Sequence, residues 1–157
     1  MFGIQKMGKI VIASDHAGYY LKEKIKDFLQ KENHDVIDVG CFSAESVDYP
    51  EFGAKAIEKI LTKEAEYGIL ICGTGLGMSI VANRFPGIRA ALCHEPFSAK
   101  MARLHNNANI LVLGGRIIGD GIAIEIVKTF LKTPFEGGRH ERRINLIEKL
   151  AKNKWIS

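Results

Sequence analysis

The sequence predicts an α/β fold: a single-domain, doubly wound (Rossmann-like) five-stranded parallel sheet with helices on both faces and a C-terminal helix. Five short apolar runs alternate with segments whose apolar residues recur at helical spacing. The third run, residues 68–72, is apolar without interruption, which fits a central parallel strand covered on both faces. At 157 residues the chain is long enough for one domain and too short for two ordinary ones.

The expected elements follow one another in a regular order. Strands are expected at residues 9–14, 35–39, 68–72, 88–93 and 109–113. Helices are expected after Gly18, over about 50–64, from the third strand to about 83, from 96 to 104, across 122–131 and across 144–150. Residues 9–152 are expected to form the domain, and residues 1–8 a short N-terminal extension.

Helical spacing also predicts which side chains are buried. In the first helix Leu21, Ile25 and Leu29 recur on one face. The other face is charged and is expected to be ordinary solvated surface: Lys22, Glu23, Lys24, Lys26 and Asp27. The second helix is expected to bury Phe52, Ala56, Ile57, Ile60 and Leu61. The fifth and sixth helices have apolar positions that include Ile122, Ile144, Ile147 and Leu150.

Composition predicts a soluble cytoplasmic protein. The formal net charge of +4 is modest and argues only weakly for anionic partners, so we expect no nucleic acid. No run approaches the roughly 18 apolar residues that span a bilayer, and the N-terminus has no signal-peptide pattern, so we expect no membrane contact. The three cysteines, Cys41, Cys72 and Cys93, are scattered, which is typical of a reducing cytosol.

The stretch Ile69–Ser79 joins an apolar run, a cysteine and a glycine loop. Glycines stand at positions 73, 75 and 77, directly after Cys72. Such a loop lets the backbone approach a ligand, and its amides at a helix N-terminus favour negative charge. A thiol there is expected to ionise more easily than a free cysteine. A structural role fits the stretch equally well, because buried cysteines act as small hydrophobes and glycines are common in strand-to-helix turns.

A dinucleotide site is a second interpretation of this loop. Residues 73–77 read GxGxG, whereas the dinucleotide fingerprint is GxGxxG on the first strand of its unit. Glu95 lies at about the right distance along the chain to meet a ribose. However, the chain leaves no room for a separate substrate domain. Cys72 and Thr74 beside the loop amides favour a small anion.

The densest positive charge in the chain lies in the segment 139–143. Arg139 and Arg143 are four residues apart, so on a helix they project from one face and can bind one phosphate together. Positive charge in a first helical turn is unfavourable unless an anion is bound. This argument favours a phosphate site over plain solvated surface.

The sequence shows no complete metal-ligand pattern. Asp15 and His16 are adjacent, but no HxH or HExxH pattern completes a site, and the cysteines lack metal-ligand spacing. We therefore expect no metal ion. A Cys–His hydrolase is also unsupported, because nothing beyond Cys72 and a histidine indicates an acyl substrate.

A series of short motifs runs from about residue 9 to residue 150: Ser14–Gly18, Asp48–Pro50, Ile71–Gly77, Gly87–Ala91, Glu95-Pro96, His105-Asn106, Gly115-Arg116 and Glu136–His140. In this order they resemble ribose-5-phosphate isomerase type B. Galactose-6-phosphate and allose-6-phosphate isomerases share that scaffold. Some type B enzymes have a glutamate a few positions after the cysteine position and lack the cysteine; Leu76 and Gly77 occupy those positions here, so the chain resembles the cysteine type.

The resemblance implies an aldose–ketose isomerase of the pentose phosphate pathway. It would interconvert D-ribose 5-phosphate and D-ribulose 5-phosphate through a cis-enediolate, with no cofactor. Cys72 would be the base and His105 the acid that opens the sugar ring. Thr74 would relay the proton of the anomeric hydroxyl, and Asp15 would orient that end of the sugar. The implied substrate-binding residues are Asp15, His16, Tyr49, Gly73, Thr74, Gly75, Leu76, Gly77, Asn106, Arg116, Arg139 and Arg143.

The resemblance also implies a homodimer or a dimer of dimers. In the family the histidine of one subunit faces the cysteine of the other, so each active site is shared. Three alternatives stay open: an isomerase of a six-carbon sugar phosphate (allose or galactose 6-phosphate), a phosphosugar-binding module without catalysis, and a nucleotide-binding oxidoreductase.

Overall fold

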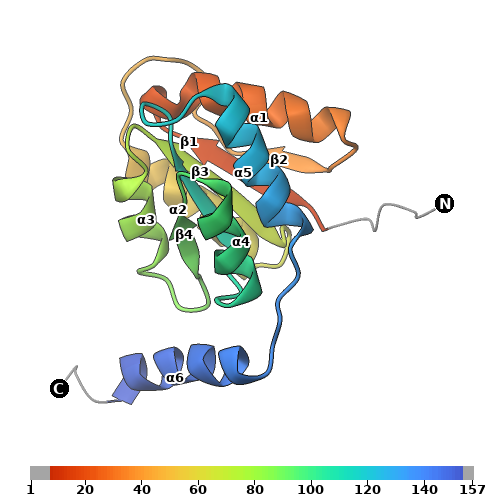
Figure 1. Ribbon diagram of the computed structural model, residues 1–157. Helices are drawn as coiled ribbons and strands as arrows, with labels where there is room; N and C mark the ends of the chain where they lie inside the picture. Colours follow the sequence, from red (N-terminus) through yellow and green to blue (C-terminus); the bar gives the residue numbers. More distant parts are fainter. Residues whose placement is uncertain (1–7, 154–157) are drawn as a thin grey trace.

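A computed structural model describes residues 8–153 and confirms the predicted fold class (Figure 1). The five strands are β1 (Ile10–Ser14), β2 (Val36–Asp38), β3 (Tyr67–Cys72), β4 (Ala90–Leu92) and β5 (Ile110–Gly114). All neighbouring pairs are parallel, and the strand order is β2-β1-β3-β5-β4. The expected N-terminal extension lies outside the described residues except for Gly8.

The helices alternate with the strands as predicted. They are the short 3-10 helix η1 (His16–Gly18), α1 (Tyr19–Lys31), α2 (Tyr49–Leu61), α3 (Leu76–Ala82), α4 (Pro96–Leu104), α5 (Asp120–Lys132) and α6 (Arg139–Asn153). α2 ends earlier than the expected residue 64. Lys63 has a left-handed backbone (φ of 64°), which stops the helix in the manner usually seen at a C′ position.

The sheet separates two apolar cores. Alternate side chains of the central strands point to opposite faces, as strand geometry requires. Ile12, Ile69 and Leu111 pack on the face covered by α1, α4 and α5. Val11 and Leu70 pack on the other face, which α2 and α3 cover. The central strand β3 is therefore buried on both faces, which explains its unbroken apolar sequence.

The chain reverses its direction of winding between β1 and β3. From β1 it first adds β2 on one side, and then returns to add β3 on the other. Ser14 at the end of β1 pairs with Ile71, and Cys72 pairs with Gly114 at the end of β5. Ligands of doubly wound sheets bind in the crevice at such a switch point, beyond the carboxyl ends of the strands. Here the switch point lies beside Cys72, at the carboxyl end of β3.

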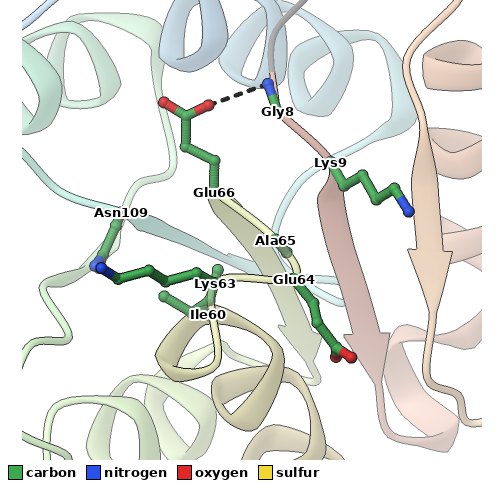
Figure 2. Close-up of a pocket in the computed structure, with 8 residues that line it drawn as sticks. All are labelled: Gly8, Lys9, Ile60, Lys63, Glu64, Ala65, Glu66 and Asn109. Carbon is green, nitrogen blue, oxygen red and sulfur yellow. Dashed lines mark hydrogen bonds between the residues drawn. The ribbon is translucent and has the colours of Figure 1, made fainter.

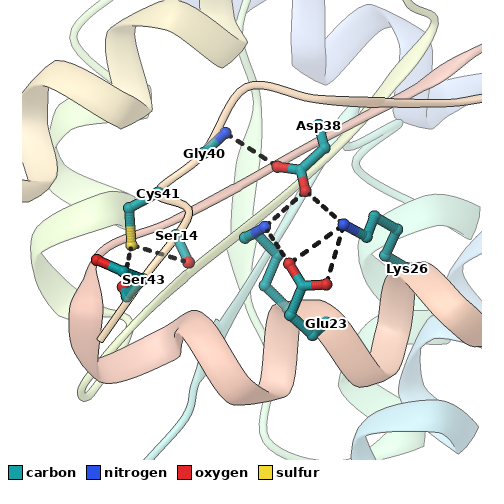
Figure 3. Close-up of polar contacts among 8 residues, drawn as sticks. Ser14, Glu23, Lys26, Asp38, Gly40, Cys41 and Ser43 are labelled. Carbon is teal, nitrogen blue, oxygen red and sulfur yellow. Dashed lines mark hydrogen bonds and ion pairs between the residues drawn. The ribbon is translucent and has the colours of Figure 1, made fainter. Parts of the chain in front are cut away.

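The lysine-rich face of α1 is not plain solvated surface. Lys22 is completely buried, and its Nζ donates to Asp38 at 2.6 Å and to Glu23 at 2.8 Å. Lys26 donates to the same Asp38 oxygen at 2.9 Å. Figure 3 shows Glu23 and Lys26 of α1 turned toward Asp38 of β2. The prediction for Lys22 was wrong because helical spacing cannot reveal that a carboxylate of the neighbouring strand lies above it.

Several helix positions expected in the core are exposed. Leu61 is 47% exposed and Ile122 is 52% exposed. On α6, Ile144 is buried, but Ile147 is 60% exposed and Leu150 is 44% exposed. The reason for α6 is its position: the helix stands apart from the layered body (Figure 1). No helix within residues 8–153 combines the length and apolar character needed to cross a lipid bilayer.

The Asp38 cluster generates a prediction about stability and pH. Burial alone would raise the pKa of Asp38, but the hydrogen bonds from Lys22, Lys26 and the Gly40 amide together lower it. Asp38→Asn should reduce the free energy of unfolding by about 3 kcal/mol near neutral pH, because it leaves buried Lys22 without its main partner. A folded-state pKa below the unfolded one means that this contribution is present above about pH 4 and is lost as pH falls further.

Urea unfolding of both proteins across that pH range measures the effect. Asp27→Asn is the matched control, because Asp27 pairs with Lys31 on the exposed surface of the same helix. It should change stability by less than about 0.5 kcal/mol. A difference between wild type and Asp38→Asn that does not shrink with falling pH would contradict the assignment.

Candidate functional site

A first polar cluster lies at the carboxyl edge of the sheet and includes the predicted glycine loop. Backbone bonds fix the loop: the Gly115 amide donates to the Cys72 carbonyl at 2.8 Å, and the Arg116 amide donates to the Gly73 carbonyl at 2.9 Å. The Asp15 amide donates to the carbonyl of Ile71 at 3.2 Å. The ends of β1, β3 and β5 are thereby held together.

Glycines allow the loops at this edge to pack closely against one another and against Tyr49. A Cβ on Gly114 would lie 2.7 Å from the Thr74 carbonyl oxygen, and a Cβ on Gly77 would lie 2.6 Å from the ring of Tyr49. Gly75 has φ of 81°, which favours glycine, and it begins the short helix α3. The structure thus places the ring of Tyr49 against Gly77 of the glycine loop.

All three cysteines lie near the carboxyl ends of strands, since the Cys41 amide donates to the Ser14 carbonyl at the end of β1 and Cys93 directly follows β4, but only Cys72 leads into the glycine loop. It is the last residue of β3 and is 4% exposed within the single chain. Cys93 lies in the core, where burial and, to a lesser extent, the charge of Glu95 raise the pKa of its thiol to about 11. Cys41 donates its thiol to the Ser43 carbonyl at 3.3 Å. Its place directly before the glycine loop therefore distinguishes Cys72 from Cys41 and Cys93.

Three further predicted residues have local structural partners in this cluster. The Asp15 Oδ1 atom accepts from the amides of Ala17 at 2.9 Å and Gly18 at 3.1 Å, so it caps the turn after β1. The His16 Nδ1 atom accepts from the Val47 amide at 3.1 Å. The Thr74 hydroxyl accepts from the Leu76 amide at 3.3 Å, while Thr74 itself is exposed. Asp15 Oδ2, His16 Nε2 and the Thr74 hydroxyl proton are not used by these bonds.

A second cluster lies at the amino edge of the sheet. His105 follows α4, and its ring stacks on that of His140 in the first turn of α6, with centroids 4.1 Å apart and planes 9° apart. A carboxylate oxygen of Glu136 lies 3.7 Å from His105 Nε2 and 3.9 Å from His140 Nε2. His140 is 6% exposed, and its Nε2 atom has no hydrogen-bond partner among the described residues. Burial, and to a lesser extent the electrostatic effect of the neighbouring His105 and Arg139, lower the pKa of His140.

This second cluster does not suit a metal ion, although the three candidate ligand atoms lie within 4.8 Å of one another. The parallel rings of His105 and His140 do not share a plane, so one ion cannot lie in the plane of both imidazoles as coordination requires. The nearby Arg139 and Arg143 also add positive charge, which lowers the pKa of His140 and would repel a cation.

The two clusters lie at opposite edges of one subunit. The Asn109 carbonyl, four residues after His105, accepts from the Gly68 amide near the start of β3 at 2.9 Å. Cys72 lies four residues further along β3, roughly 13 Å away at the usual strand rise of about 3.3 Å per residue. Cys72, Thr74, Tyr49 and Arg116 therefore belong to one edge. Asp15, His16 and the glycine loop belong to that same edge, whereas His105, Asn106, Arg139 and Arg143 belong to the opposite edge.

The sequence pattern assigns no role to Glu136 or His140. Both lie in the motif Glu136–His140, but their contact with His105 depends on how α6 is attached after α5. The segment before α6 returns to the end of α4, where the Glu136 amide donates to the Leu104 carbonyl at 2.9 Å. In the sequence, only the four-residue spacing of Glu136 and His140 indicates that their side chains lie close together.

The cavity in Figure 2 lies away from Cys72. It has a volume of about 510 Å³, and Lys9, Ile60, Lys63, Glu66 and Asn109 are among its lining residues. These residues lie at the amino ends of β1, β3 and β5 or at the end of α2. None of the predicted site residues lines this cavity, and the chemistry of the two clusters is a better guide to function than its volume.

Known proteins resemble this chain in sequence and in fold. The family model described as Ribose/Galactose Isomerase matches residues 10–147. Ribose-5-phosphate isomerase B of Escherichia coli is 42% identical over 94% of this chain and 99% of that protein. A ribose 5-phosphate isomerase of Thermotoga maritima superimposes with a TM-score of 0.89, at 60% identity over 90% of this chain and 98% of that one. The Mycoplasma genitalium enzyme, solved with bound ribulose-5-phosphate, gives a TM-score of 0.88 at 42% identity, over 93% and 97% of the two chains.

Close packing of the glycine loop generates a prediction. Gly114→Ala should lower the free energy of unfolding by about 2 kcal/mol, because the new methyl group meets backbone atoms of Thr74 that cannot move independently. Gly121→Ala is the control, since a Cβ there would have no neighbour within 4 Å. Urea unfolding of both variants provides the comparison. Equal stability of Gly114→Ala and wild type would show that the loop is not tightly held.

Proposed function

The chain belongs to the ribose/galactose isomerase family, and on that premise we propose that it interconverts D-ribose 5-phosphate and D-ribulose 5-phosphate. The choice of substrate rests on the similarity to the Mycoplasma genitalium enzyme, which was solved with bound ribulose-5-phosphate. The 60% identity to the Thermotoga maritima ribose 5-phosphate isomerase supports the same choice. The reaction is an aldose–ketose isomerisation that moves one proton between C2 and C1 through a cis-enediolate.

Cys72 is the proposed base of the proton transfer. Its thiolate would remove the proton from C2 of the aldose, or from C1 of the ketose, and return it to the neighbouring carbon. The position at the carboxyl end of β3, at the switch point of the sheet, supports this role. The backbone amides of Gly73–Gly77 would hold the enediolate oxygen as negative charge develops there.

Ring opening precedes this step because ribose 5-phosphate is mainly cyclic. His105 would protonate the ring oxygen, and Thr74 would relay the proton of the anomeric hydroxyl. Asp15 would orient that end of the sugar, and Asn106 would bind a hydroxyl group. The exposed side chains of Thr74 and Asn106 are accessible to a substrate.

The phosphate would be bound by arginines from both clusters. Arg139 and Arg143 are both exposed in the first two turns of α6, where they can bind the same anion. Arg116 and His16 lie at the opposite edge, beside the glycine loop, and Tyr49 lines the pocket there. The four phosphate-binding groups can therefore meet only if two subunits combine.

A homodimer with shared active sites resolves this separation. The amino edge of one subunit, with its His105, would face the carboxyl edge of the second, with its Cys72. The exposed apolar side chains of α6, Leu146, Ile147 and Leu150, support a buried contact of this helix with another subunit. Such dimers can pair further into a dimer of dimers. The three free cysteines support a reducing, cytoplasmic location.

Kinetics on matched substrates test the proposed function. The protein should convert ribose 5-phosphate with a higher kcat/KM than allose 6-phosphate or galactose 6-phosphate. Cys72→Ser should reduce solvent deuterium exchange at C2 at least about a hundredfold, because the base is lost, while binding of the phosphosugar survives. Cys93→Ala is the control thiol variant and should retain turnover. Unchanged exchange in Cys72→Ser would exclude the Cys72 thiolate as the base. A higher kcat/KM for a hexose phosphate would show that the substrate is a hexose phosphate instead.

Subunit complementation tests the shared site. Cys72→Ser and His105→Gln homodimers should each be inactive. Random mixing of the two chains should restore about one quarter of wild-type turnover, since half of the dimers are mixed and each mixed dimer has one intact site. The measurement is turnover after unfolding and refolding the two variants together, with each variant refolded alone as the control. No recovery, despite mixed dimers detected by mass, would place both residues in one subunit's site.

A further inference from the structure

Arg103 is a buried cation without a carboxylate partner among residues 8–153. It lies in the last turn of α4, two residues before His105, and is 5% exposed. Its guanidinium carbon lies 4.9 Å from the ring centroid of Tyr67 and 5.7 Å from that of Phe130. Because an arginine stays protonated in proteins, carbonyl oxygens, hydroxyl groups and aromatic faces must balance its charge.

The guanidinium holds the turn that follows α4. Nη1 donates to the Asn107 side-chain oxygen at 2.9 Å and to the Ala108 carbonyl at 2.6 Å. Asn107 adopts a left-handed backbone with φ of 46°, so the chain bends sharply here. The turn carries His105 and Asn106 at its start. Its geometry thus depends on a side chain that takes no part in the chemistry.

The same guanidinium holds the segment that leads to α6. Nε donates to the Thr133 carbonyl at 3.3 Å, directly after the end of α5. Three residues later the Glu136 amide donates to the Leu104 carbonyl at 2.9 Å. This double attachment brings α6 to the end of α4, where His140 stacks on His105.

We propose that Arg103 is a positioning residue that sets His105 and Asn106 in place relative to Arg139 and Arg143. This inference rests on the proposed function, because the relative position matters only if His105 opens a ring whose phosphate the two arginines bind. The planar fork of arginine reaches four acceptors from three separate nitrogens, whereas a lysine would have to reach all of them from one nitrogen. Misplacement of a catalytic group by about 1 Å can cost up to a hundredfold in rate.

A matched pair of variants separates positioning from general stability. Tyr67→Phe removes the hydroxyl that accepts from Arg103 Nη2 at 3.1 Å; this hydroxyl belongs to β3 and not to the turn. Asn107→Gly removes the acceptor of Nη1 within the turn, and glycine adopts φ of 46° without strain. Each variant deletes one hydrogen bond of the same guanidinium. Arg103→Lys, the third variant, keeps the charge and removes the fork.

Two rates are compared for each variant. The first is turnover of cyclic ribose 5-phosphate, which needs ring opening. The second is solvent deuterium exchange at C1 of saturating ribulose 5-phosphate, which has no ring because its C5 oxygen carries the phosphate. Arg103→Lys and Asn107→Gly should lose about tenfold in the first rate and less than about twofold in the second, as expected when a bond to a charged group is lost at one step. Tyr67→Phe should change both rates by less than about twofold.

Thermal unfolding establishes that each variant is folded, and Asn107→Gly tests the inference even if Arg103→Lys does not fold. Equal losses in both rates, or the same loss in Tyr67→Phe and Asn107→Gly, would overturn the positioning role and leave Arg103 a purely structural residue. Absence of ribose 5-phosphate turnover in the wild type would instead overturn the proposed function, and this inference with it.

Discussion

The shared direction of the five strands is the constraint on which the rest of the molecule depends. Parallel strands place all their carboxyl ends at one edge, so each helix must return the chain to the other edge. Residues that end a strand, such as Cys72, collect at the first edge. Residues that end a returning helix, such as His105, collect at the second. One subunit therefore carries two polar clusters at opposite edges, which it cannot bring together.

Each edge is kept in shape by different forces. At the carboxyl edge, close packing fixes the loops: Gly114 leaves room for the backbone of Thr74, and Gly77 leaves room for the ring of Tyr49. Carbonyl groups at the strand ends also accept hydrogen bonds from amides of neighbouring loops. At the amino edge, a buried guanidinium binds carbonyls from two segments. The first arrangement is sensitive to any added side chain, and the second to the loss of one particular side chain.

The strand pattern could be predicted because it depends on neighbours in the chain. Unbroken apolar runs indicate burial on both sides wherever they occur, so the strand positions and the parallel sheet followed directly. The burial of Lys22 could not be predicted, since it depends on Asp38 in a different element. The exposure of Ile147 could not be predicted either. Helical spacing shows which residues share the apolar face of a helix, but not whether another element packs against that face. Glu136 and His140 gain their contacts only through the path of the chain after α5.

The sequence by itself determined the fold class, the glycine loop after Cys72 and the placement of Arg139 and Arg143 on one face of a helix. Each of these depends on a local pattern: apolar runs, closely spaced glycines, and two arginines four residues apart. The ordered motifs also indicated the family that the comparisons confirm. Only the tertiary structure decided which of these residues are neighbours. It placed Cys72 with Arg116 and Tyr49, and His105 with Glu136 and His140, since the distance along a strand, and not the distance in sequence, separates the two edges of a parallel sheet.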